Sequence, residues 1–296
     1  MANLIIDDAF WIKVGIAALL AVSVYLPVTT GALSVPQAGL AAIGAYSAVL
    51  AYKHGIAFWP AVIVAVAVGS AVGFLLTLFT ARLSLFGLAI ITVGFGEIVR
   101  VILVNLDFTG GSLGIVGIPL RTTVWTVYIP LALIVVLVSR LEAGPLGRSL
   151  AMIRTDRDAA EAAGVNTLLV QRTAIFLSAP IAAYAGVMQA FFSGYLDPST
   201  FGLDLVVTTM MAVVLGGMTS IWGAIVGSVF ISLVPELFRD LARWRIVAYG
   251  VFMVVALGFR TEGLISRSLV VQIRSVARRL VQQVLGARSP AEVRSI

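Results

Sequence analysis

The residues able to do chemistry are few in this chain, and they gather in one segment. Charged residues make up only 11% of the 296 positions, yet eight of the 20 Lys and Arg and 14 Asp and Glu residues lie in segment 140–164. Such a cluster offers ionic and hydrogen-bonded contacts to another macromolecule. An ordinary basic loop beside a membrane is the other interpretation of the same pattern. The eight residues are Arg140, Glu142, Arg148, Arg154, Asp156, Arg157, Asp158 and Glu161.

Catalytic and metal-binding chemistry has little support in the sequence. Cysteine is absent and His54 is the sole histidine, so neither a disulfide framework nor a His/Cys metal site is expected. A phosphate-binding loop needs Gly-Lys-Ser/Thr, but the two lysines, Lys13 and Lys53, follow Ile12 and Tyr52. We therefore expect no ATPase site, no ATP or Mg²⁺ bound by this chain, and no hydrolytic catalysis.

The composition is that of an integral membrane protein. Hydrophobic residues make up 60% of the chain and the mean hydropathy is +1.07, whereas soluble globular domains are roughly 45–50% apolar. The net charge of +6 and the pI near 10.1 would suggest nucleic acid in a soluble protein. Here the charges lie beside apolar runs, so anionic membrane lipids are the expected partner and nucleic acid is not.

The apolar runs predict an all-α polytopic fold with eight to nine transmembrane helices, some of them discontinuous. Asp7 and Asp8 stand where a cleaved signal would carry basic residues, so the first span is expected to be retained. The expected spans are 10–29, 33–52, 57–80, 84–106, 122–139, 169–194, 203–217, 220–237 and 244–260.

Arginine positions predict the orientation of these spans. Arg82, the 140–172 region and the tail hold most of the basic residues, which places them on the cytoplasmic side, with loops 107–121 and 195–204 outside. Arg239, Arg243 and Arg245 fall on the other side of this topology, unless span 203–217 or 220–237 is re-entrant. Residues 266–296 form a separate basic tail, expected to be an amphipathic helix on the inner membrane surface.

Glycine and proline are expected to interrupt the second and fourth spans and to break the seventh span from the eighth. Such interruptions free backbone groups that hydrocarbon cannot satisfy, so they favour a translocation path, although close helix packing through small residues explains the same glycines. Glu97 and Arg100 are spaced i,i+3 and are expected to pair, either beside the path or as a structural pair. The translocation-path candidates are Pro36, Gln37, Gly44, Gly94, Gly96, Glu97, Arg100, Gly216 and Gly217; Gly39, Gly87 and Gly223 mark further interruptions.

Turn and cap signals predict two short helices in the charged segment. Gly144-Pro145 ends the preceding span, and residues 149–154 form a first helix. Asp156 occupies the N-cap position of a second helix over 159–163, which Gly164 closes as the C′ residue.

Five motifs in order resemble the permease subunits of bacterial ABC importers for branched-chain amino acids, of the LivM type. They cover about residues 31–265. The quoted text is LSVPQAGLAAIGAYSAVL, LFGLAIITVGFGEIVRVILVN with TGGSLGIVGIP, GRSLAMIRTDRDAAEAAGVN, MAVVLGGMTSIWGAIVGSVFISLVPE, and YGVFMVVALGFRTEGL.

The resemblance implies a permease domain over 1–265 whose coupling loop, 140–168, docks on a separate ATPase subunit. It also implies a second permease of the LivH type, ATPases of the LivG and LivF types that carry ATP and Mg²⁺, and a periplasmic binding protein, at the bacterial inner membrane. The implied coupling residues are Gly147, Arg148, Ile153, Arg154, Asp156, Ala159, Ala160 and Gly164.

Two alternatives remain open at this point. The first is the same importer architecture with urea, a short amide, a sugar or a nucleoside as its substrate. A secondary transporter without ATP is the alternative from another class, but such carriers usually hold several acidic residues within their spans, and here only Glu97 is clearly inside one.

Overall fold

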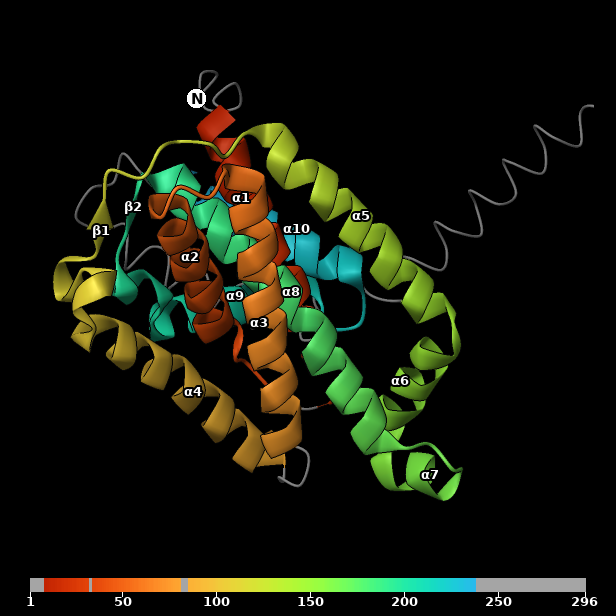
Figure 1. Cartoon of the computed structure of the whole chain (residues 1–296). Coiled ribbons are helices and arrows are strands. Elements are labelled where there is room, and N and C mark those ends of the chain that lie inside the picture. Colours follow the sequence, from red (N-terminus) through yellow and green to blue (C-terminus); the bar gives the residue numbers. More distant parts are fainter. Residues whose placement is uncertain (1–7, 32–33, 81–84, 238–296) are drawn as a thin grey trace, which may run out of the picture.

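The computed structural model describes residues 8–31, 34–80 and 85–237, and these residues are mostly helical (Figure 1). A two-stranded antiparallel sheet pairs β1 (Ile115–Val116) with β2 (Tyr195–Leu196), and short 3₁₀ turns flank it at Asp107–Thr109, Gly111–Leu113 and Pro198–Phe201. The α-helices are α1 (Asp8–Val28), α2 (Gln37–Lys53), α3 (Phe58–Thr80), α4 (Leu85–Asn105), α5 (Val124–Ala143), α6 (Pro145–Thr155), α7 (Arg157–Ala162), α8 (Thr167–Ser193), α9 (Leu203–Gly216) and α10 (Ile221–Leu237).

The predicted all-α membrane architecture is confirmed. Five described helices, α1, α3, α4, α5 and α8, are long and apolar enough to cross a membrane, and α9 and α10 are shorter apolar helices. The helix bounds follow the first eight predicted spans to within a few residues. The ninth predicted span, 244–260, the tail 266–296, and Arg82, Arg239, Arg243 and Arg245 lie outside the described residues.

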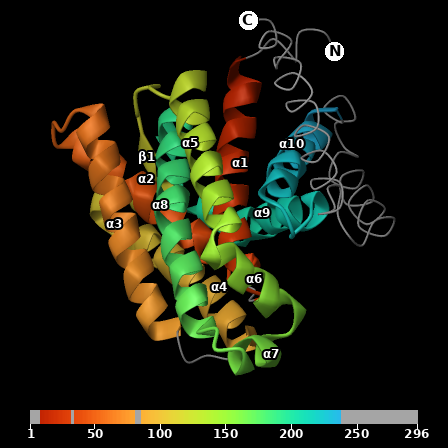
Figure 2. The ribbon, with the colours of Figure 1, turned by 90° about the vertical axis from the view of Figure 1, so that its right-hand side faces the viewer.

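Helices α1, α2 and α8 form the centre of the bundle, and the others cover them. In the most apolar 18-residue stretches of α1 and α8, 72% of the residues are buried. In those of α4 and α5 only 22% are buried, so these two helices expose an apolar face. Figure 2 shows α8 between α3 and α5, with α9 and α10 on the far side of α1. A helix that is apolar all round is expected in the interior, as α1 is.

Small residues set the distance between α8 and its neighbours. A side chain at Gly44 would overlap the backbone of Ala183, and one at Gly186 would overlap the backbone of Ala41. Gly69 on α3 lies against the methyl group of Ala183 in the same way. Small residues let helix backbones approach closely where lipid offers no hydrophobic driving force.

The predicted interruptions of α2 at Gly39 and Gly44, and of α4 at Gly87, Gly94 and Gly96, are wrong. Both helices run continuously through these positions. Gly39 faces Phe95 and Gly96, and Gly44 faces Ala183, so close packing explains these three glycines without a backbone break. Among the residues that the structure describes, none outside the helix itself lies within 4 Å of a Cβ added at Gly94, so packing does not explain this glycine.

The break predicted between the seventh and eighth spans is confirmed. Gly217 ends α9 with a φ of +111°, a conformation that residues with a Cβ rarely adopt. The two helices then fold back on each other, and a side chain at Gly216 would overlap the backbone of Gly223.

The sheet brings together two loops that are far apart in sequence. Ile115 pairs with Leu196 and Val116 with Tyr195, so loops 107–121 and 195–204 lie at one end of α5 and α8. The charged segment with α6 and α7 lies at the other end (Figure 2). This agrees with the predicted topology, in which the two loops share one side of the membrane and the charged segment has the other.

Candidate functional site

The charged segment folds into a compact unit of two short helices, α6 and α7, which we call the ledge. Gly144 caps the end of α5, and Pro145 is the first residue of α6, where its missing N–H costs nothing. Gly147 is buried against the turn, and a side chain there would overlap the backbone carbonyl of Glu142. The sharp turn from α5 into the ledge therefore requires glycine at this position.

The second ledge helix has the predicted caps. Asp156 Oδ1 accepts a hydrogen bond from the backbone N–H of Ala159 at 3.0 Å, which satisfies one of the free donors at the start of α7. Gly164, two residues after the helix, has a φ of +84°. The N-cap and C′ predictions for this helix are confirmed.

A small apolar core holds the ledge together. It consists of Leu150, Ile153, Ala160 and Val170, which are all buried, with Leu146 and Val165 packed against them. Val170 belongs to α8, so this core fastens the ledge to the membrane helix that follows it. Ile153 and Ala160 point inward and give the ledge its shape.

Arg154 ties the ledge to the rest of the bundle. Its Nε donates to the backbone carbonyl of Thr29, just after α1, at 3.1 Å. Its Nη2 donates to Met218 O at 3.0 Å and its Nη1 to Thr219 O at 3.4 Å, both in the turn between α9 and α10. One guanidinium therefore connects α6 with the ends of three other helices.

A second polar contact reinforces this junction. The hydroxyl of Tyr25, which is 1% exposed, donates to Glu142 Oε1 at the end of α5. A cavity of about 490 Å³ lies beside the tie, lined by Val28, Thr30, Gly31, Ile153, Arg154, Arg157, Met218 and Thr219. The junction is therefore not completely filled by side chains.

The outer face of the ledge is exposed. Arg148, Asp156, Ala159 and Gly164 are all exposed. A groove of about 400 Å³ runs between α6 and α7, lined by Ala151, Met152, Thr155, Asp156, Ala159 and Ala160. This face carries both charges and small apolar residues, a combination suited to a protein partner.

Arg157 and Glu161 stabilise α7 itself. Arg157 Nε lies 3.4 Å from Glu161 Oε1, and the Thr167 hydroxyl donates to the same carboxylate. The hydrogen bond from Thr167, followed by the contact with Arg157, lowers the pKa of the Glu161 carboxyl below its ordinary value.

The path candidates do not form one cluster. Pro36 and Gln37 lie at the start of α2, buried in the bundle, while Gly44 and Gly96 serve helix packing. Arg100 Nε bonds to Glu97 Oε2 at 2.8 Å, so the predicted pair forms, with its side chains 34% and 29% exposed. The pair lies beside Gly202, at the start of α9.

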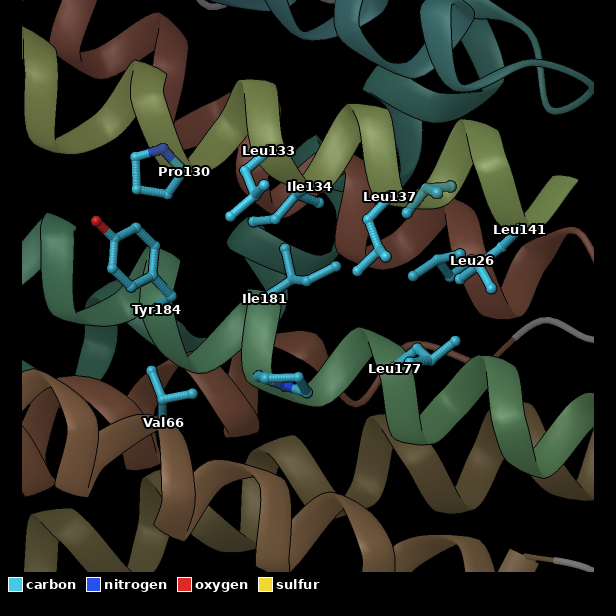
Figure 3. A pocket seen from close by; sticks show the side chains of 12 residues that line it. Leu26, Val66, Pro130, Leu133, Ile134, Leu137, Leu141, Leu177, Ile181 and Tyr184 are labelled. Carbon is cyan, nitrogen blue, oxygen red and sulfur yellow. The ribbon is translucent and has the colours of Figure 1, made fainter.

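An apolar groove between α5 and α8 is unsuited to a charged substrate (Figure 3). It has a volume of about 300 Å³ and is lined by apolar side chains and by Tyr184, whose hydroxyl donates to Thr126 O. Its remaining lining residues are Leu26, Val66, Pro130, Leu133, Ile134, Leu137, Val138, Leu141, Leu177, Pro180 and Ile181.

Sequence reasoning missed the partners of Arg154 and the contact between Tyr25 and Glu142. Thr29, Met218 and Thr219 accept these bonds through their backbone carbonyls. Every residue has such a carbonyl, so the sequence does not indicate which ones bind Arg154. Arg154 itself was found because it lies in the charged segment.

Comparison with known proteins gives one family and two close relatives. Residues 8–257 match the family described as "Branched-chain amino acid transport system / permease component". The chain is 33% identical over 272 residues to the high-affinity branched-chain amino acid transport system permease protein LivM of Salmonella typhimurium, and 32% identical to LivM of Escherichia coli. Each alignment covers 80% of this chain but only 64% of the relative's length. No solved structure matches the chain significantly.

Proposed function

This chain belongs to the permease family of branched-chain amino acid transport systems, and on that premise we propose that it is the membrane-spanning subunit of an ATP-driven importer. The proposed substrates are branched-chain or related amino acids, and the proposed location is the inner membrane of a bacterium. The names of the LivM relatives support this substrate class.

The Arg154 tie is the observation that carries the proposal. A permease without a phosphate-binding loop has to receive the work of ATP hydrolysis from another protein, through a unit that is exposed on one side and connected to membrane helices on the other. The ledge has an exposed outer face, and Arg154 joins it to α1 and to the turn between α9 and α10.

The predicted coupling residues divide into two roles under this proposal. Arg148, Asp156, Ala159 and Gly164 lie on the exposed face and contact the ATPase subunit. Gly147, Ile153, Arg154 and Ala160 lie inward and keep the ledge rigid, so that a push on the outer face reaches the membrane helices.

The proposed assembly contains separate subunits for ATP hydrolysis, for the membrane pathway and for substrate delivery. ATP and Mg²⁺ bind to two ATPase subunits of the LivG and LivF types, and a second permease of the LivH type completes the pathway. A periplasmic binding protein delivers the amino acid, and anionic lipids surround the basic regions of the chain.

Transport by the purified assembly in lipid vesicles tests the proposal. Uptake of labelled leucine is expected to require ATP on the ledge side and the loaded binding protein on the other, and to survive ionophores that collapse ion gradients. Uptake that needs no ATP and stops with the ionophore would instead establish a secondary transporter. Uptake of urea or a sugar in place of leucine would overturn the substrate class alone.

A further inference from the structure

The start of α2, residues 34–39, lies inside the bundle although it is the end of a helix. All six residues are buried. Pro36 occupies the N-cap position and supplies no side-chain hydrogen bond to the helix. The first N–H groups of any α-helix lack partners within the helix, and a buried end normally has a cap or a ligand to satisfy them.

Two polar side-chain atoms at the start of α2 are also unsatisfied. Within residues 8–31, 34–80 and 85–237, no group bonds to Ser34 Oγ or to Gln37 Oε1, although both atoms are buried. Ser34 is 0% and Gln37 2% exposed. Leaving a polar group buried without a partner is destabilising, so this arrangement is unfavourable unless something binds there at some stage.

The neighbouring contacts orient Gln37 firmly. Its Nε2 donates to the carbonyl of Ser23 on α1 at 3.2 Å, which leaves Oε1 as the free end of the amide. On the other side, Val35 N donates to Thr92 Oγ1 of α4 at 3.1 Å. The amide of Gln37 is therefore fixed to α1, and the backbone just before α2 is fixed to α4.

A small closed cavity lies beside Gln37. It measures about 10 Å³ and is lined by Leu20, Val24, Val35, Gln37, Ala38, Leu205, Val206 and Thr209. A volume of this size accommodates about one water molecule. Thr209 donates its hydroxyl proton to Leu205 O at 2.6 Å, so toward other groups this hydroxyl offers only acceptor capacity.

We propose that the start of α2 is the binding site for the charged head group of an amino acid on its way through the permease. The ammonium group bonds to Gln37 Oε1 and Thr209 Oγ1. The carboxylate bonds to the Ser34 hydroxyl and to the first N–H groups of α2, where the helix dipole favours negative charge. The apolar side chains of Leu20, Val24 and Leu205 face a branched aliphatic side chain. This inference rests on the proposed transport function.

The site is closed in this structure, and α9 is the wall that has to move. Leu205, Val206 and Thr209 all belong to α9. The far end of α9 leads into the Gly217 turn, whose Met218 and Thr219 carbonyls are held by Arg154. A displacement of the ledge therefore reaches the wall of the site through one short helix.

Three variants in the assembled importer test this site. Gln37→Met keeps the length of the side chain but removes the acceptor together with the Nε2 donor to Ser23 O. Thr209→Val removes a hydroxyl at constant shape. Thr208→Val is the matched control, because Thr208 makes the same kind of bond within α9, to Asp204 O at 2.7 Å, but does not line the cavity. Labelled leucine uptake and ATP hydrolysis stimulated by the loaded binding protein are measured in the same vesicles.

Gln37→Met is expected to lower leucine uptake about ten- to a hundredfold, the effect of one hydrogen bond to a charged group, while stimulated ATP hydrolysis stays within about twofold. Thr209→Val lowers uptake several-fold and Thr208→Val leaves it unchanged. Wild-type uptake in both Gln37→Met and Thr209→Val, or an equal loss in Thr208→Val, would overturn the site. If Gln37→Met does not assemble, Thr209→Val decides. If the wild-type assembly itself shows no ATP-dependent uptake, the proposed function fails instead.

Discussion

The ledge and the start of α2 both carry polar groups, but those named on the ledge have hydrogen-bond partners and two at the start of α2 do not. On the ledge Arg154 donates to three backbone carbonyls, and Asp156 caps α7. At the start of α2, Gln37 Oε1 and Ser34 Oγ have no partner among the described residues. These satisfied groups lie at the end of the bundle and these two unsatisfied ones within it. Arg172 Nε, near the ledge end of α8, is a further buried atom without a partner among the described residues.

This difference distinguishes polar groups that stabilise the fold from polar groups that are available to a ligand. A polar group that already has its partners holds a structure together and gains little from a ligand. A buried group without a partner is paid for in stability, and such groups are kept where a ligand or water bonds to them at some stage. We therefore interpret the ledge as a rigid transmitter and the start of α2 as a receptor.

The largest expected effect comes from destroying the ledge. Ala160 is 1% exposed within the apolar core of the ledge, so Ala160→Glu buries a carboxylate without a partner, at a cost of about 3–5 kcal/mol. We expect insertion into the membrane to be normal, while co-purification with the ATPase subunits and leucine uptake are lost. Ala162→Glu, at an exposed position of the same helix, is the control. Normal uptake by Ala160→Glu would show that the ledge is not needed.

A smaller effect is expected when the ledge stays folded but loses its hydrogen bonds to the rest of the bundle. Arg154→Met removes three hydrogen bonds from a charged donor, together about 2–4 kcal/mol at this partly exposed position. Assembly with the ATPase subunits should persist, whereas uptake per ATP hydrolysed falls at least tenfold. Arg140→Met provides a control at an exposed arginine of α5. An unchanged uptake-to-ATP ratio in Arg154→Met would refute the transmitter role.

The smallest effect concerns the pH dependence of α7. Because the pKa of Glu161 is lowered in the folded ledge, this carboxylate contributes stability above its unfolded pKa, and the contribution is lost as the pH falls through the lowered value. Thr167→Val removes the hydrogen bond that is the largest cause of the shift. The difference in Tm between wild type and Thr167→Val is therefore expected to be present at pH 7 and to vanish in acid. A difference that is constant across this range would assign Thr167 to packing alone.

Most of the fold follows from local sequence patterns. Span 84–106 was predicted and α4 runs from Leu85 to Asn105; span 169–194 was predicted and α8 runs from Thr167 to Ser193. The caps at Asp156 and Gly164 were predicted as well. These features depend on apolar length and on contacts between residues at most a few positions apart, and sequence displays both.

The roles of individual residues needed the tertiary structure. Gly44 and Gly96 resembled helix breaks, but they pack against other helices, because a glycine without a Cβ serves either purpose and only the opposing helix decides which. Arg154 bonds to carbonyls 64, 65 and 125 residues away. Gln37 is an ordinary polar residue in sequence, and it becomes a candidate binding group only because α1 and α9 enclose it. Every residue has a backbone carbonyl, and the burial of a side chain depends on helices that are distant in sequence. The partners of Arg154 and the enclosure of Gln37 are therefore decided by long-range packing alone.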